Sequence, residues 1–202
     1  MSPTSEIVLP GRGRPYLPGD SLDHSAPLAV WIAELVPAAT CAALIARITA
    51  LGPAAAPVTT HRGMVMMPDV RNNERVMFDD RELAATLWAL VAPLVPATLC
   101  ESTAVGLNER FRGYRYRPGH RFAPHYDGAF VRDDRERSLL TLLLYLDEGC
   151  TGGATSFPHH GRAIVPRRGG ALWFQHHLWH AGDEVTAGEK HVLRTDVMYR
   201  AA

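Results

Sequence analysis

Two histidines and one aspartate in the second half of the chain have the types and spacing of a metal site. His125 and Asp127 are two positions apart, so on a strand their side chains would point to the same side. His180, from a later segment, could complete a face of two imidazoles and one carboxylate. Such a face fills three positions of an octahedral metal ion and leaves the opposite three open. The spacing therefore predicts a metal site that can bind further ligands on its open side.

A His-x-Asp pair alone is weak evidence, because the chain contains 10 histidines. The residues after His180 strengthen the metal interpretation. Lys190 and Arg194 would share one face of a strand, and a cation inside a barrel is costly unless it meets an anion. A dicarboxylate co-substrate would supply that anion. Sites with two histidines, one carboxylate and open positions are typical of non-haem Fe(II) oxygenases, which bind dioxygen there.

Four ordered blocks surround these residues. They read YRYRPGHRFAPHYD at 114–127, TLLLYL at 141–146, GGATSF at 152–157, and GALWF at 170–174 with HAG at 180–182 and the stretch 190–199. Over roughly residues 105–200, the chain thereby resembles the prolyl 4-hydroxylase-like family of Fe(II)/2-oxoglutarate-dependent oxygenases. The resemblance implies a double-stranded β-helix core, a jelly roll of the cupin-like type, with N-terminal helices supporting one sheet.

The resemblance also implies roles for single residues. The two histidines and the aspartate described above match the iron ligands. Lys190 matches the cation that pairs with the distal carboxylate of 2-oxoglutarate, and Arg194 is a second candidate because a guanidinium can hold a carboxylate by two hydrogen bonds. Tyr116 and Thr141 match hydroxyl groups near the same carboxylate, with plain barrel packing as the alternative for both.

We therefore expect an Fe(II)- and 2-oxoglutarate-dependent dioxygenase that hydroxylates an unactivated C–H bond and releases succinate and CO2. No appended peptide-binding domain is recognisable, so the expected substrate is an amino acid, an amino-acid-like small molecule or a natural-product intermediate. One alternative is a hydroxylase of prolyl or other peptidyl residues in a protein. Another is a cupin-like metalloenzyme that does not use 2-oxoglutarate. The cation at Lys190 or Arg194 discriminates against this last class.

A polar segment before residue 76 is a candidate for substrate binding. Arg71, Asn73 and Arg75 would alternate onto one strand face, and two arginines with an amide suit a polar or carboxylate-bearing substrate. The alternative is a solvated loop. Trp179 directly precedes His180 and could line the mouth of the pocket.

Two adjacent histidine pairs, at 159–160 and 176–177, are interpreted as parts of surface loops. Neither pair has a carboxylate nearby at ligand spacing. Adjacent residues of a strand point in opposite directions, so at most one of residues 176 and 177 could face the pocket.

The elements that must position these residues follow from periodicity and turn signals. Residues 1–27, rich in Pro and Gly, predict an extended arm with a short strand at 7–9. Residues 28–202 predict one oxygenase domain, mainly β with N-terminal helices (α+β), with helical support over about 28–100 and a β-helix core over about 101–202. Helices are expected over 28–51, divided or started by Pro37, and over 81–91, capped at 79–80. Strands are expected at 112–117, 139–146, 163–165, 171–174 and 192–199.

Composition narrows the function classes further. The chain has 202 residues, and its 21 Lys+Arg balance its 21 Asp+Glu, so we expect no nucleic-acid and no membrane partner. No apolar run is long enough to span a bilayer, and the first residues lack the features of a secretory signal. Three widely spaced cysteines predict a reduced, cytoplasmic protein. We expect a monomer or homodimer whose partner is its small-molecule or peptidyl substrate.

Overall fold

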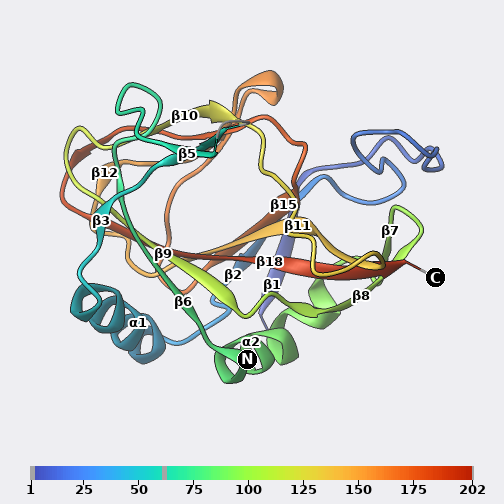
Figure 1. Cartoon of the computed structure of the whole chain (residues 1–202), viewed down its shortest axis with the longest axis horizontal. Coiled ribbons are helices and arrows are strands. Elements are labelled where there is room, and N and C mark those ends of the chain that lie inside the picture. The colour runs from blue at the N-terminus through green and yellow to red at the C-terminus, as the bar shows by residue number, and fades with distance from the viewer. Residues whose placement is uncertain (1–2, 61–62, 202) are drawn as a thin grey trace.

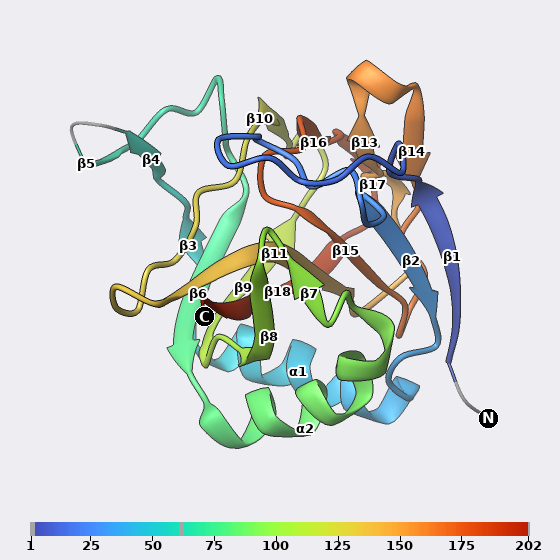
Figure 2. The same ribbon diagram turned by 90° about the vertical axis from the view of Figure 1, so that its right-hand side faces the viewer.

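The computed structural model describes residues 3–60 and 63–201. Two facing β-sheets enclose the centre of the molecule, and two helices cover the outer face of the larger sheet (Figure 1, Figure 2). In chain order the elements are β1 (Thr4–Leu9), β2 (Ala29–Ala33), α1 (Ala38–Ala50), β3 (Ala54–Ala55), β4 (Val58–Thr60), β5 (Gly63–Val65), β6 (Glu74–Asp79), α2 (Arg81–Val91), the 3-10 helix η1 (Ala92–Leu94), β7 (Thr98–Leu99), β8 (Ser102–Leu107), β9 (Arg110–Tyr116), β10 (Phe122–His125), β11 (Glu136–Tyr145), β12 (Thr151–Gly152), β13 (Thr155–Phe157), the 3-10 helix η2 (Pro158–His160), β14 (Arg162–Ile164), β15 (Ala171–Gln175), β16 (His180–Gly182), β17 (Val185–Ala187) and β18 (Lys190–Ala201).

The larger sheet follows the order β1-β2-β15-β11-β18-β9-β6-β3, and β8 also pairs with β18. The smaller sheet follows the order β10-β16-β13-β14. Its strands lie opposite the larger sheet, at the top of Figure 2, whereas both helices lie at the bottom. This arrangement is the double-stranded β-helix that the resemblance implied.

Two cores explain why the central strand β11 is apolar from Leu139 to Tyr145, with Thr141 as the exception. Leu140, Leu142 and Leu144 belong to the core between the larger sheet and the helices. Leu143 and Tyr145 point the other way, into the core between the two sheets. Because successive strand residues alternate between faces, a strand covered on both sides must be apolar on both. The same alternation decides which residues of β9, β15 and β18 face the interior.

The helices pack closely against the larger sheet. Helix α1 buries Cys41, Leu44 and Ile48. A Cβ atom at Gly113 of β9 would lie 2.5 Å from Cγ1 of Ile48, so glycine is needed there for this close approach. Helix α2 begins where the sequence predicts, and the Asp80 side chain accepts a hydrogen bond from the backbone N–H of Leu83.

The helix predicted over 28–51 is only half correct. Residues Ala29–Ala33 form strand β2, which pairs with β1 on one side and β15 on the other. The helix begins after Pro37, which has an extended backbone. Val30, Trp31 and Ile32 fit a pleated strand, and burial between two strands outweighs the local helical pattern. The predicted N-terminal arm likewise begins with a strand, β1, which forms one edge of the larger sheet. Within the described residues, no helix has the length and apolar character to span a membrane.

Candidate active site

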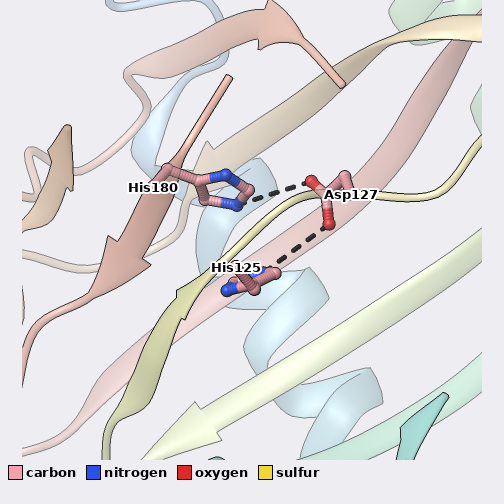
Figure 3. Close-up of side chains that lie close together, drawn as sticks. All are labelled: His125, Asp127 and His180. Atoms are coloured by element: carbon pink, nitrogen blue, oxygen red, sulfur yellow. Dashed lines mark ion pairs between the residues drawn. The ribbon is translucent and has the colours of Figure 1, made fainter. Parts of the chain in front are cut away.

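The three predicted ligand residues meet between the two sheets. His125 ends β10, Asp127 follows two positions later, and His180 opens β16. Strands β10 and β16 are antiparallel neighbours, and their register sets His125 directly opposite His180. One ligand atom from each of the three residues lies within 4.8 Å of the others. In Figure 3 both imidazoles turn toward the carboxylate, with Nε2 at 3.7 Å (His125) and 3.5 Å (His180) from its oxygens.

The second ring nitrogen of each histidine fixes its orientation. Nδ1 of His125 lies 2.8 Å from the carbonyl oxygen of Ala123, and Nδ1 of His180 lies 2.9 Å from that of Leu178. In each ring Nδ1 therefore carries the hydrogen and donates it, which leaves the lone pair of Nε2 free for a metal. Burial lowers the pKa of His180 to about 4, so this imidazole is neutral near pH 7. The donor set fits a divalent metal ion.

Asp127 is held as an anion although it is buried. Burial alone would raise its pKa, but the charge of Arg194 and, after it, the contacts with the two histidines hold the pKa well below its usual range. Nη1 of Arg194 donates to Oδ1 of Asp127 at 2.6 Å, and the hydroxyl of Thr141 donates to Oδ2 at 2.6 Å. The carboxylate thus has a fixed orientation before any metal binds.

A further layer of hydrogen bonds supports Asp127. The backbone N–H of Asp127 donates to the carbonyl of His176 at 3.0 Å. The ring of His176 contacts Thr141 through Nδ1 (3.0 Å) and Ser138 through Nε2 (2.8 Å). The prediction of a surface loop is therefore wrong for His176, which is buried, whereas His177 is exposed. The reason is that His176 directly follows β15 and lies next to Asp127, where its ring connects the buried hydroxyl groups of Thr141 and Ser138.

Lys190 lies in a narrow cavity that also contains the predicted metal ligands. It is buried at the start of β18, its Nζ donates to the carbonyl of Gly153 at 2.5 Å, and the ring centre of Tyr116 lies 4.9 Å from Nζ. Tyr116, Thr155 and Lys190 line this cavity together with the three ligand residues. Burial lowers the pKa of Lys190 to about 8.

The four residues predicted to contact 2-oxoglutarate form two groups by their direct contacts, although Arg194 lines the narrow cavity together with Tyr116 and Lys190. Tyr116 and Lys190 are cross-strand neighbours on β9 and β18. Thr141 and Arg194 instead contact Asp127, as described above. Lys190 and Arg194 are four positions apart on β18, which corresponds to about 13 Å along an extended chain.

A second cavity, of about 530 Å³, opens on another side of His125 and Asp127. Two of the four predicted substrate residues, Arg71 and Arg75, line it. Asn73 is buried, and its Oδ1 accepts a hydrogen bond from Nε of Arg71 at 2.7 Å. Trp179 lies beside this cavity rather than in its wall, with its ring 4.6 Å from that of Tyr126.

Several cavity residues were missed in the sequence, among them three with polar side chains. Arg112 and Tyr114 line the second cavity, and Thr155 lines the narrow one. A signal for the first two was present, because an inward Tyr116 places residues 114 and 112 on the same strand face. No comparable pattern singles out Thr155.

Comparison with known proteins gives one family and several structural relatives. Residues 111–195 match the model of the 2OG-Fe(II) oxygenase superfamily. The structure is similar to the viral collagen prolyl hydroxylase of Paramecium Bursaria Chlorella virus-1 in complex with 2OG (TM-score 0.63, 23% identity, covering 88% of this chain and 98% of that one). It is also similar to a Pseudomonas putida prolyl-4-hydroxylase (TM-score 0.61, 19% identity, 87% and 93%).

A third relative is a Trichoplax adhaerens prolyl hydroxylase, solved in complex with a hypoxia inducible factor oxygen degradation domain peptide fragment (TM-score 0.65, 16% identity, covering 84% of this chain and 83% of that one). No curated protein matches the sequence. At these identities the structural relatives establish the fold. The family match includes both histidines and the aspartate, as well as Lys190 and Arg194.

Proposed function

We propose that this chain, a member of the 2OG-Fe(II) oxygenase superfamily through residues 111–195, hydroxylates a prolyl or other residue of a peptide or protein. It is a 2-oxoglutarate-dependent dioxygenase whose cofactors are Fe(II) and 2-oxoglutarate. The family match disfavours the cupin-like alternative that needs no keto acid. The observation that carries the proposal is the cluster of His125, Asp127 and His180 in the narrow cavity, with His125 and Asp127 also in the wall of the second cavity.

In this proposal the three residues hold the metal. Two imidazoles and one carboxylate, all oriented by hydrogen bonds of their own, would occupy one face of the ion. When bound, Fe(II) activates dioxygen and the keto acid is oxidised to succinate and CO2. The chain's own contribution is to orient the ligands, exclude water and hold the substrate C–H bond nearby.

Lys190 is the residue that we assign to the distal carboxylate of 2-oxoglutarate. It shares the narrow cavity with the metal ligands and with Tyr116, whose hydroxyl would assist. Arg194 is a poorer candidate, because its guanidinium already contacts Asp127 at 2.6 Å. Arg194 and Thr141 would instead keep the carboxylate ligand ionised and oriented.

The second cavity is the proposed substrate site. It is open, and His125 and Asp127 are part of its wall. Solved relatives described as prolyl hydroxylases, one of them with a bound peptide fragment, support a peptidyl substrate over the small molecule expected from the sequence. The resemblance concerns the shared core, so the substrate needs its own experiment.

The cofactor assignment is tested by adding Fe(II) and 2-oxoglutarate to metal-free protein without oxygen. We expect a weak visible absorption band from the keto acid bound to ferrous iron. His125→Ala and His180→Ala should abolish it, whereas the matched control His177→Ala, at an exposed position, should keep it. A band that survives both ligand substitutions would contradict the assigned site. With the band established, prolyl peptides should stimulate succinate release under air.

A further inference from the structure

Four arginines from three strands and one loop line the second cavity: Arg71, Arg75, Arg112 and Arg194. Arg75 lies on β6 opposite Tyr114, and Arg112 lies on β9 opposite Arg194 of β18. Residues that pair across neighbouring strands point to the same face of the sheet. The larger sheet therefore directs these cations together toward the interior, where like charges repel.

The carboxylates nearby leave part of this charge unpaired. Arg112 and Arg194 share Asp196, at 3.1 and 3.3 Å, and Arg194 also contacts Asp127. In contrast, within residues 3–60 and 63–201 neither Arg71 nor Arg75 forms an ion pair with a carboxylate.

Arg71 is the most informative of the four. Only 4% of its surface is exposed. Its guanidinium carbon lies 4.7 Å from the ring centre of Tyr114 and 4.4 Å from that of Phe122, and Nε donates to the neutral Asn73. Nη2 is buried and has no hydrogen-bond partner among the described residues. An oriented, buried donor without a partner at a cavity wall points to a bound acceptor.

Loading the metal site would not neutralise this cluster. Fe(II), Asp127, the 2-oxoglutarate dianion and Lys190 have a formal net charge of zero together. One further carboxylate, that of Asp196, then remains to balance the positive charges of the four guanidinium groups. It contacts two of them, Arg112 and Arg194. Buried cations are costly without counter-charge, so an anion in the second cavity would stabilise the loaded enzyme.

The positive charge of the cluster also lowers the pKa values of side chains within and beside it. Burial would raise the pKa of Tyr114, but Arg71, Arg194 and Arg112 outweigh burial and lower it. The pKa of Arg75 is lowered by burial and further by the surrounding arginines.

We propose that the substrate carries a carboxylate, which Arg71 and Arg75 bind in the second cavity while the reacting C–H bond faces the metal. This inference rests on the proposed function, since it names the chemistry that the same enzyme recognises. His125 and Asp127 share the cavity wall with these arginines, so the carboxylate belongs to the hydroxylated residue or to its neighbour. It is therefore either the terminal carboxylate of a chain or the side chain of an adjacent acidic residue.

Two matched pairs of capped compounds distinguish these sources. N-acetylproline against N-acetylprolinamide tests the terminal carboxylate, and acetyl-Pro-Asp-amide against acetyl-Pro-Asn-amide tests the acidic side chain. Their binding is measured by calorimetry, without oxygen, on protein loaded with Fe(II) and saturating 2-oxoglutarate. We expect at least one acid to bind tenfold or more tightly than its neutral partner. Equal binding within both pairs, or no binding by either acid, would overturn the inference.

Two variants locate the effect. Arg75→Gln alters a partly exposed side chain and should bring the acid and its neutral partner to within about twofold of each other, while the Fe(II)/2-oxoglutarate absorption band persists. The control Arg117→Gln, at an exposed position directly after the end of β9, should leave the discrimination intact. If Arg75→Gln weakens 2-oxoglutarate binding instead, the cluster serves the co-substrate and the inference is wrong. Absence of the band in unmodified protein would contradict the proposed function itself.

Discussion

Burial lowers the pKa of Lys190 to about 8, because its ammonium group lies between the two sheets. Cys150, Asp183 and Asp147 partly oppose this shift, and the rings of Tyr116 and Tyr145 face the same nitrogen. Near pH 7 most molecules therefore carry a charged Lys190. A lysine whose charge is this easily lost would make the co-substrate binding proposed for Lys190 depend on pH.

We predict that 2-oxoglutarate binds more weakly as the pH rises through about 8. The dianion prefers the protonated form of Lys190, so deprotonation removes its counter-charge, and affinity should fall roughly tenfold from pH 7 to pH 9. Calorimetry with Mn(II)-loaded protein measures this directly. Lys190→Arg keeps its charge throughout this range, so its affinity should stay nearly constant. The same pH dependence in both proteins would show that Lys190 is not the titrating group.

At the scale of elements, helix α2 depends on its first residues. Asp80 accepts a hydrogen bond from the backbone N–H of Leu83 at 2.8 Å and pairs with Arg47 of α1 at 2.5 Å. The cap satisfies a free N–H group at the helix start, and the ion pair joins the two helices that support the larger sheet. The hydrogen bond from Leu83 and then the contact with Arg47 lower the pKa of Asp80.

We predict that Asp80→Ala lowers the free energy of unfolding at pH 7 by about 1–2 kcal/mol. A carboxyl group with a lowered pKa stabilises the fold above its unfolded pKa, and this stabilisation is lost as the pH falls through its folded pKa. The difference between Asp80→Ala and the unmodified protein should therefore shrink at acidic pH. Urea unfolding at several pH values measures it. Asp80→Asn keeps a capping oxygen and should lose less, so equal losses in the two variants would refute the role of the cap.

At the scale of the whole molecule, the proposed ligands connect the two sheets. His125 and His180 come from the smaller sheet, whereas Lys190 comes from the larger one. A metal ion with its keto acid would therefore bridge both walls of the fold. Ligands that bind only the folded state raise its stability by mass action.

We predict that Mn(II) at a hundredfold excess over its Kd raises the free energy of unfolding by about 2.7 kcal/mol, and that 2-oxoglutarate at the same excess over its own Kd adds about as much again. Thermal unfolding with metal alone, and with both ligands, separates the two contributions. His180→Ala should lose both contributions, while Lys190→Ala should keep the metal contribution and lose that of the keto acid. Equal stabilisation of His180→Ala and the unmodified protein would place the metal elsewhere.

Local patterns were sufficient to predict much of the fold. Alternation and apolar runs located the strands that became β9, β11, β15 and β18, and a cap with 3.6-residue periodicity located α2. The pair His125 and Asp127 was also accessible, because positions two apart on one strand share a face. The prediction of a double-stranded β-helix is confirmed, and the roles assigned to the ligand residues stay predictions that the metal experiments test.

Only the tertiary structure decided how distant segments meet. Residues 29–33 form a strand because β1 and β15 pair with them, which the local helical pattern does not encode. Arg194 and Thr141 contact Asp127, and His176 is buried behind them, because the register of β11 and β18 brings them there. The arginine cluster likewise depends on β6, β9 and β18 lying side by side. Cross-strand register is set by packing between segments far apart in the chain, and short-range periodicity carries no information about it.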